Sequence, residues 1–337
     1  AGVLAAQYFG AQKPGEVRRI ASTSIVLFLG LGAAMSVLGV VLARMLLTDL
    51  LQTHPAHLEM AVSYFSIYAA GLVFQFGYNI AAAILRAIGD SKATLYFLFA
   101  SSLVNIVLDL LLVAVVKMGV AGAAVATVIS QLLSCVLSFW YMHRKYEFLR
   151  FSPRELRFEP ALARRVLTIG APMAVQQSVV SCGFMFLQRL VNSCGEDMVA
   201  SFTVGSRIEN YLILPTISFQ STMATYTGQN IGAKQPERVS RGLRQVILLA
   251  LCITLPLSAA AYFLAPQIIS LFAISGQAAA YCAQHLHLAA WAVLVFAVYF
   301  PCNGLLQGAG EGLYATACAA LALGVRVALA YLLVKTA

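Results

Sequence analysis

The chain has 337 residues, of which 61% are hydrophobic and only 10% are charged. A soluble domain usually carries about 25% charged residues, so this composition excludes an ordinary soluble protein and indicates a polytopic membrane protein. Lys and Arg outnumber Asp and Glu by 22 to 13, which gives a formal net charge of +9. We interpret this excess as a signal of membrane topology and not of nucleic-acid binding, with a site for lipid headgroups as the alternative.

Long apolar stretches predict membrane-spanning helices, because about 20 apolar residues cross the core of a bilayer. The stretches are too long and too uniformly apolar for the strands of a membrane barrel. We expect the chain to begin inside a helix that ends near residue 10. The helices predicted after it lie, in chain order, at residues 18–47, 58–86, 92–116, 119–143, 166–193, 199–229, 238–265, 280–307 and 312–335.

Basic residues gather in segments that alternate regularly along the chain. These segments are residues 10–19, 86–92, 143–165 and 229–244, and two predicted crossings separate each from the next. Cytoplasmic loops of membrane proteins carry an excess of Lys and Arg. We therefore expect these four loops to lie in the cytoplasm.

One basic loop occurs twice in the sequence. The stretch QYFGAQKPGEVRR, residues 7–19, returns as QNIGAKQPERVSR at residues 229–241, and ILRAIGDSKATLYFLF, residues 84–99, has its counterpart in LLQGAGEGLYATACAA at residues 305–320. Self-similarity at a fixed offset indicates duplicated structure. Both copies of the loop are basic, so the two halves have the same orientation and each holds an even number of helices.

The offset also predicts how much of each half is present. We expect an all-α polytopic fold of two parallel six-helix repeats, twelve membrane helices in the full protein, of which this chain holds about nine and a half. The first helix, most of the second and the last would lie outside the chain. We assign residues 1–143 to an N-lobe, 144–165 to a cytoplasmic linker and 166–337 to a C-lobe.

The motifs QxxGAxxPxxV (twice), ILRAIGDSK, NIVLDLLLV and IGAPMAVQQ together resemble the multidrug and toxic compound extrusion (MATE) family, in its DinF-like bacterial branch. The resemblance implies a V-shaped MATE/MOP-type architecture in the bacterial inner membrane. It implies an antiporter that exports amphipathic, often cationic organic compounds by alternating access, in exchange for protons, with sodium as the alternative ion. We expect no enzyme activity, no cofactor beyond the coupling ion, no nucleic-acid partner, and a monomer surrounded by membrane lipids.

Asp109 is the main candidate for binding the coupling ion. It lies deep in an apolar stretch, where an ionisable residue is costly and therefore a functional candidate. Asn105 precedes it by four residues on the same helical face, and its amide can donate to the carboxylate. Low dielectric favours the protonated form of a carboxyl group, so Asp109 could take up and release a proton. The alternative is a simple hydrogen bond between helices.

The family resemblance extends this proton site. It implies an Asn and an Asp at this spacing together with a Thr on the sixth helix, a position that Thr127 matches. The second half has Arg326 and Ala330 where the first has Asn105 and Asp109, so we place the proton site in the first half. The Glu that NorM-type relatives carry on the seventh helix is replaced by Val180, which favours protons over sodium.

Other polar residues inside predicted helices are candidates for a substrate cleft. Glu209 could attract a cationic substrate or a coupling ion, or it could form a salt bridge to another helix, for example to Arg326. The two histidines of the tenth helix, His285 and His287, could titrate near neutral pH but cannot share one helical face, so we predict no metal site. The cleft candidates, each of which could instead make interhelical hydrogen bonds, are Glu209, Arg207, Gln176, Gln177, Ser181, Asn79, Asn303 and Arg326.

Two other functions remain open at this point. A flippase for lipid-linked oligosaccharides of the same superfamily would require a more cationic cleft. An intramembrane protease is suggested by AIGDS, residues 87–91, but the stretch lies at a predicted cytoplasmic loop and lacks a partner aspartate motif.

Overall fold

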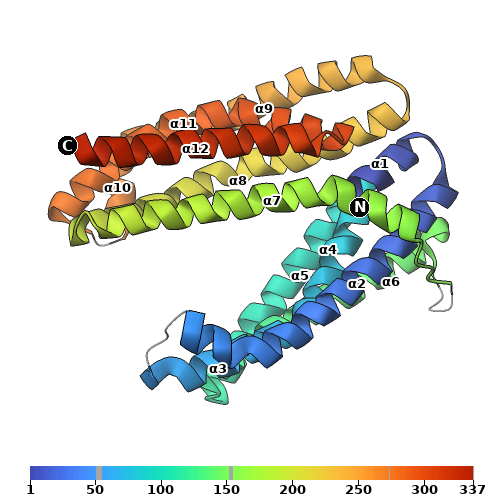
Figure 1. Ribbon diagram of the computed structural model, residues 1–337, viewed down its shortest axis with the longest axis horizontal. Helices are drawn as coiled ribbons and strands as arrows, with labels where there is room; N and C mark the ends of the chain where they lie inside the picture. Colours follow the sequence, from blue (N-terminus) through green and yellow to red (C-terminus); the bar gives the residue numbers. More distant parts are fainter. Residues whose placement is uncertain (51–54, 152–154, 273, 337) are drawn as a thin grey trace. The chain divides into compact units, whose positions relative to one another are not determined.

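The computed structural model describes residues 1–337 except 51–54, 152–154, 273 and 337 (Figure 1). The described residues form helices joined by short turns, with no strand among them. The chain divides into two compact units, residues 1–166 and residues 167–337.

In the first unit, α2 and α6 make most of the contacts between helices. α2 packs against α3 and α4, and α6 packs against α3, α4 and α5. Its helices are α1 (Gly2–Gly10), α2 (Pro14–Met45), α3 (Pro55–Ala70), α4 (Leu72–Ala87), α5 (Ser91–Asp109) and α6 (Gly119–Lys145), with π-helical segments at Leu46–Leu50 and Leu110–Val115.

The second unit is organised around α11, which contacts α8, α9, α10 and α12 (Figure 1). Its helices are α7 (Pro160–Asn192), α8 (Glu196–Gly232), α9 (Pro236–Phe263), α10 (Ala265–Ser270), α11 (Gly276–Ala309) and α12 (Gly312–Thr336). α7 begins at Pro160, well before the expected residue 166. Proline suits the first turn of a helix, where its missing N–H has no intrahelical partner.

The helix expected at residues 58–86 is two helices, α3 and α4, which meet at Gly71 with a bend of 40°. α6 approaches closely at this bend: a Cβ atom at Gly71 would lie 2.5 Å from a methyl carbon of Val128 on α6. Among the described residues, six helices are long and apolar enough to cross a membrane, and the bent pair makes a seventh span. This agrees with the polytopic helical fold expected from the sequence.

The backbone repeats itself at the two copies of the duplicated loop. Gln12 and Lys234, which are equivalent in the repeat, both have positive φ, at 56° and 57°. The glycines of the second pair of repeated segments, Gly89 and Gly310, have φ of 91° and 94°. Left-handed backbone is uncommon for residues other than glycine, so its recurrence at matching positions supports a duplication of structure as well as of sequence.

The polar segment between the predicted lobes is folded onto the first unit. Leu149 is 1% exposed and belongs to a hydrophobic core that also contains Val17 and Met142. Two ion pairs hold the same segment to the beginning of α2, Arg18 to Glu155 at 2.9 Å and Arg19 to Glu159 at 2.5 Å, and both are solvent-exposed. The segment is therefore a packed part of this unit and not a free linker.

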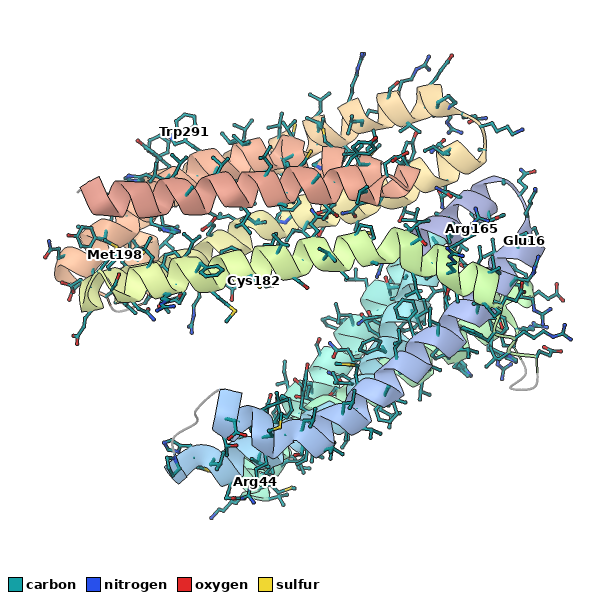
Figure 2. The ribbon with its side chains drawn as sticks, in the orientation of Figure 1. Glu16, Arg44, Arg165, Cys182, Met198 and Trp291 are labelled. Carbon is teal, nitrogen blue, oxygen red and sulfur yellow. The ribbon has the colours of Figure 1, made fainter. Side chains whose placement is uncertain are left out.

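The residues labelled in Figure 2 locate this end of the first unit. Glu16 and Arg165 lie at one end of the unit and Arg44 lies at the opposite end. Arg165 donates to the hydroxyl of Tyr8 at 3.1 Å. The basic loops of the first unit thus gather at the end where the polar segment packs.

Asp90 fixes the turn between α4 and α5. Its Oδ1 accepts from the backbone N–H of Ala93 and caps α5. Its Oδ2 accepts from the hydroxyls of Tyr141 at 2.9 Å and Tyr146 at 2.6 Å and from the ammonium of Lys145 at 2.8 Å. The carboxylate therefore joins this turn to the end of α6.

The structure predicts an acid-sensitive contribution of Asp90 to stability. Burial raises the pKa of Asp90, but hydrogen bonds from Lys145, Tyr146 and Tyr141 outweigh it and lower the pKa to about 2. Because the folded state favours the ionised form, this contribution is complete above the ordinary value of 3.8 and is lost as the pH falls through about 2. We expect Asp90→Asn to lower the free energy of unfolding by about 1.5–3 kcal/mol at pH 7, since hydrogen bonds to charged groups contribute this much.

Thermal unfolding in detergent at pH 7 and at pH 3 tests this prediction. The deficit of Asp90→Asn should be smaller at pH 3. The control is Glu311→Gln, because Glu311 is the counterpart of Asp90 in the repeat and is exposed. A deficit that is the same at both pH values, or equal in the two variants, would contradict the role assigned to the Asp90 carboxylate.

Candidate functional site

α5 has two faces of different character, and Asn105 and Asp109 lie on the inner one. Ala93 and Ser101 are buried and Asn105 and Asp109 are partly buried, at steps of four residues along the helix. The opposite face exposes large apolar side chains, namely Leu95, Leu98, Phe99, Leu103, Ile106 and Val107. Such a face suits lipid contact, so the two polar residues point into the first unit.

Three buried polar atoms on α5 and α6 have no hydrogen-bond partner among the described residues. They are Nδ2 of Asn105, Oδ1 of Asp109 and Oε1 of Gln131. The amide donation from Asn105 to Asp109 that we expected is therefore not formed: the shared helical face brings the two residues together without pairing them. Since buried polar groups are nearly always satisfied in proteins, three such atoms on two neighbouring helices are an exception.

The α5–α6 hairpin places Thr127 of α6 beside Asn105 and Asp109 of α5. A Cβ atom at Gly122 on α6 would lie 3.2 Å from Leu112, which fixes how the two antiparallel segments are paired. From this contact, we count toward the beginning of α5 and, in parallel, toward the end of α6. Each residue advances a helix by about 1.5 Å, so Asp109 is opposite about residue 125 and Asn105 is opposite about residue 129. Thr127 therefore lies at the level between them.

Thr127 and Gln131 share one face of α6. The hydroxyl of Thr127 donates to the carbonyl of Ala123 at 2.9 Å, so it is satisfied within its own helix and keeps an acceptor lone pair. Gln131 follows by four residues and contributes the third unpartnered atom. Our sequence analysis missed Gln131, although an amide one turn after Thr127 in an apolar stretch was a visible signal.

The helix changes geometry next to the carboxylate. α5 ends at Asp109, and the next six residues, Leu110–Val115, are π-helical. π-helical turns are rare and occur often at functional sites, because they widen the helix and shift its backbone hydrogen bonds. Asp109 thus lies where α5 departs from regular α-helix.

Glu209 in the second unit has a partner that the sequence did not indicate. Its Oε2 lies 3.1 Å from Nε2 of His285, and the two side chains are 16% and 23% exposed. Arg326, the partner considered above, has a side chain outside the described residues. Arg207, two positions before Glu209, is exposed. Glu209 therefore belongs to a pair that joins α8 to α11.

Asn303 lies inside the contact between α8 and α11. It is 4% exposed, its carbonyl oxygen accepts from the amides of Gln220 at 3.2 Å and Gln307 at 2.7 Å, and its amide donates to the hydroxyl of Tyr299 at 3.2 Å. This network satisfies Asn303 within the unit. The structure assigns it to helix packing and not to a substrate-contacting surface.

The remaining cleft candidates lie at the surface of their own units. Gln176 is half-buried, and the exposed ones are Asn79, Gln177, Ser181 and Arg207. On α8, Arg207 lies in an exposed stripe of mostly polar residues, with Thr203, Asn210, Ser218 and Ser221, which the exposed Leu214 interrupts. A polar stripe on a membrane helix is costly in contact with lipid, so this face suits water or substrate better than acyl chains.

The two histidines of α11 contact different helices. His285 pairs with Glu209 on α8, whereas Nε2 of His287 lies 3.1 Å from the carbonyl of Tyr262 on α9. Among the described residues, no group of three or more His, Cys, Asp or Glu side chains is arranged to hold a metal ion.

Comparison with known proteins identifies the family. The family model described as MatE matches residues 1–111 and 172–332. The probable multidrug resistance protein YpnP of Bacillus subtilis is 31% identical over 287 residues, which cover 85% of this chain and 64% of that protein. The probable multidrug resistance protein YoeA of the same organism is 27% identical over 340 residues, which cover 98% of this chain and 73% of that protein. This chain thus spans less than two thirds of the length of the first of these relatives.

Solved structures show the same fold. A MATE protein crystallised in the straight conformation superposes with a TM-score of 0.92 at 24% identity, covering 99% of this chain and 75% of that chain. The same comparison with a bent conformation gives a TM-score of 0.78 at 21% identity, covering 98% and 82%. Because the family model matches well over half of the residues, the chain belongs to the multidrug and toxic compound extrusion (MATE) family, which its duplicated loop and NIVLDLLLV motif had predicted.

Proposed function

We propose that this protein is a secondary active transporter that exports amphipathic, often cationic organic compounds in exchange for protons. Membership of the MATE family supports transport, and two relatives are named as probable multidrug resistance proteins. The observation that carries proton coupling is the set of unpartnered buried atoms of Asn105, Asp109 and Gln131 inside two apolar helices.

These residues can bind one proton and respond to its loss. An ionised Asp109 in this apolar hairpin is costly, and protonation removes the charge. The protonated carboxyl can donate to the hydroxyl oxygen of Thr127, which keeps an acceptor lone pair, whereas the ionised carboxylate can accept from the free amide of Asn105. Each protonation state thus has a partner within the same hairpin.

Exchange requires that the two ligands favour different conformations. If the protonated first unit favours one conformation and bound substrate favours the other, each ligand lowers the affinity for the other by the same factor. A proton entering from outside then promotes substrate release. Sodium remains the alternative ion, because carboxylate, amide and hydroxyl oxygens are also its usual ligands.

In the proposed topology, Asp109 lies near the outer side of the membrane, from which the protons enter. We place the loops at residues 10–19, 86–92, 143–165 and 229–244 in the cytoplasm, on the charge rule. α5 then runs outward, and Asp109 lies only about 9 Å before the end of its span, at about 1.5 Å per residue. This position favours proton uptake from the outer surface of a bacterial inner membrane.

Ethidium transport by the complete protein in liposomes tests the proposal. Wild-type protein should move ethidium against its gradient when a proton gradient is imposed, and a sodium gradient of equal size should be without effect. Transport driven only by the sodium gradient would show that sodium, and not the proton, is the coupling ion. Absence of transport under both gradients, across several organic cations, would contradict export of cationic compounds.

A flippase for lipid-linked oligosaccharides is the second candidate. The observation that favours it is the exposed Arg207 on the polar stripe of α8, whereas the nearby Glu209 is in contact with His285. A cationic surface suits a pyrophosphate-linked cargo. Translocation of a fluorescent lipid pyrophosphate by liposomes that fail to move ethidium would favour this reading.

A further inference from the structure

The beginning of α9 carries a cluster of exposed cations. Lys234, Arg238, Arg241 and Arg244 lie close together in the sequence, and the acid among them is Glu237. All five side chains are exposed. Within the described part of the chain, none of them forms an ion pair. The positive charge at this end of the second unit is therefore available to an anionic partner.

The cations continue an exposed apolar face of the same helix. Leu248 and Leu255 follow Arg241 at steps of seven residues, which is the same side of a helix, and they are 62% and 52% exposed. The opposite side, which includes Ala250, is buried. An exposed leucine face suits acyl chains, and Arg241 and Arg244 lie roughly 6–10 Å beyond Leu248, at about 1.5 Å per residue. The cations are thus placed where this apolar face ends.

The start of α9 is held firmly against α8. The hydroxyl of Tyr226 donates to the carbonyl of Arg238 at 3.3 Å. A Cβ atom at Gly242 would lie 2.2 Å from Cε1 of the same ring, so the ring packs directly on the backbone of α9. These contacts fix which side of α9 is buried. Arg241 and Arg244 are therefore carried by an ordered helix and not by a loose loop.

The first unit shows what neutralises the equivalent cation there. Arg19 and Arg241 are equivalent in the repeat, and Arg19 pairs with Glu159 at 2.5 Å and with Glu16 at 2.8 Å. The second unit has Arg238 at the position of Glu16. An acid of the first unit is thus replaced by a further cation, which raises the demand for an external anion.

The start of α9 is not suited to a polar segment like the one that covers α2. Ser22 holds that segment by donating to the carbonyl of Arg157 at 3.1 Å and accepting from its N–H at 2.7 Å. The equivalent of Ser22 is Arg244, and a guanidinium has no acceptor for a backbone N–H. It does suit a phosphate group, because its N–H donors match two phosphate oxygens.

We propose that the beginning of α9 binds an anionic phospholipid, whose phosphate accepts from Arg241 and Arg244 while its acyl chains lie along Leu248 and Leu255. Clusters of four or more Lys and Arg beside a membrane helix recognise anionic lipids in this way. In the proposed topology the lipid belongs to the cytoplasmic leaflet. The binding goes beyond the proposed function and does not depend on transport.

Native mass spectrometry of the complete protein, released from micelles and titrated with phosphatidylglycerol, tests this site. The concentration that half-saturates the first bound phosphatidylglycerol should rise about 30-fold in the double variant Arg241→Gln, Arg244→Gln, because each cation near an anionic surface contributes roughly fivefold. The double variant Arg241→Lys, Arg244→Lys keeps the charge and should retain most of the affinity. Phosphatidylcholine, which has no net charge, should bind equally to all three proteins.

The matched control is the double variant Lys13→Gln, Lys92→Gln, which removes two exposed cations of the first unit. It should bind phosphatidylglycerol like wild type. An equal loss in the control, unchanged binding in the Arg241→Gln, Arg244→Gln variant, or displacement of the lipid by an equal concentration of inorganic phosphate would overturn the proposal. If the double variant does not fold, the single variants Arg241→Gln and Arg244→Gln should each lose about fivefold. A protein that binds this lipid but fails to move ethidium would contradict the proposed function alone.

Discussion

Replacing Asp109 with Asn in the complete protein is expected to reduce proton-driven ethidium transport to the level of empty liposomes. Asn has nearly the same shape but cannot take up or release a proton at any physiological pH. Its neutral amide also removes the cost of a charge among the apolar helices, so the variant should fold and still bind ethidium. Transport assays under an imposed proton gradient, with ethidium binding measured by fluorescence, check both halves of this prediction.

Glu59→Gln is the matched control for Asp109. Glu59 is an exposed acid of the same unit, ion-paired with Arg44. Exposed pairs contribute about 0–1 kcal/mol, so this variant should transport ethidium like wild type. Full gradient-driven accumulation by Asp109→Asn would reduce Asp109 to a packing residue and move the search for the coupling site to the remaining membrane acids.

The second large effect, a loss of folding stability, is expected where the backbones of α8 and α11 come close to each other. A Cβ atom at Gly304 would lie 2.3 Å from the carbonyl oxygen of Gln220, and one at Gly308 would lie 2.3 Å from that of Ala224. Neither oxygen can move without moving α8. Overpacking usually costs about 1–3 kcal/mol, and separation of α8 from α11 would also break the Asn303 network, so we expect Gly304→Ala and Gly308→Ala to reach the upper end of this range.

Thermal unfolding and size-exclusion profiles in detergent measure this effect. Gly324→Ala and Gly170→Ala are the controls, because a Cβ atom at either glycine meets nothing within 4 Å. Both lie in helices, where alanine is favoured over glycine by roughly 0.5–1 kcal/mol, so the controls should match or exceed wild type. Equal behaviour of all four variants would show that the close approach of α8 and α11 is unimportant for stability.

The positions of the helices could be predicted from local sequence, whereas their irregularities could not. The apolar run at residues 92–116 became the span Ser91–Val115 almost unchanged. The bend at Gly71 lies where α6 leaves no room for a Cβ atom, and the Val128 that comes close there is distant in the sequence. The early start of α7 was hidden because charged residues around Arg164 resembled a linker.

The candidate site residues, too, could be predicted from local spacing, whereas contacts between distant helices could not. Spacing of four residues places Asn105 and Asp109 on one helical face, and the structure keeps them there. Pairings between distant helices leave no trace in one sequence, which explains why Glu209 was not matched with His285. The internal repeat was the exception, because a duplicated sequence does carry long-range information: it matched the turns at Gln12 and Lys234.

Proton movement driven by substrate is the most direct test of the central claim, that proton and substrate exchange through Asp109. Liposomes containing the complete protein and an entrapped pH-sensitive dye receive external ethidium with no proton gradient imposed. Inward ethidium movement should expel protons and make the interior more alkaline in wild type, and the Asp109→Asn variant should show no change. Ethidium entry without a pH change in wild type, or with acidification of the interior, would contradict proton exchange.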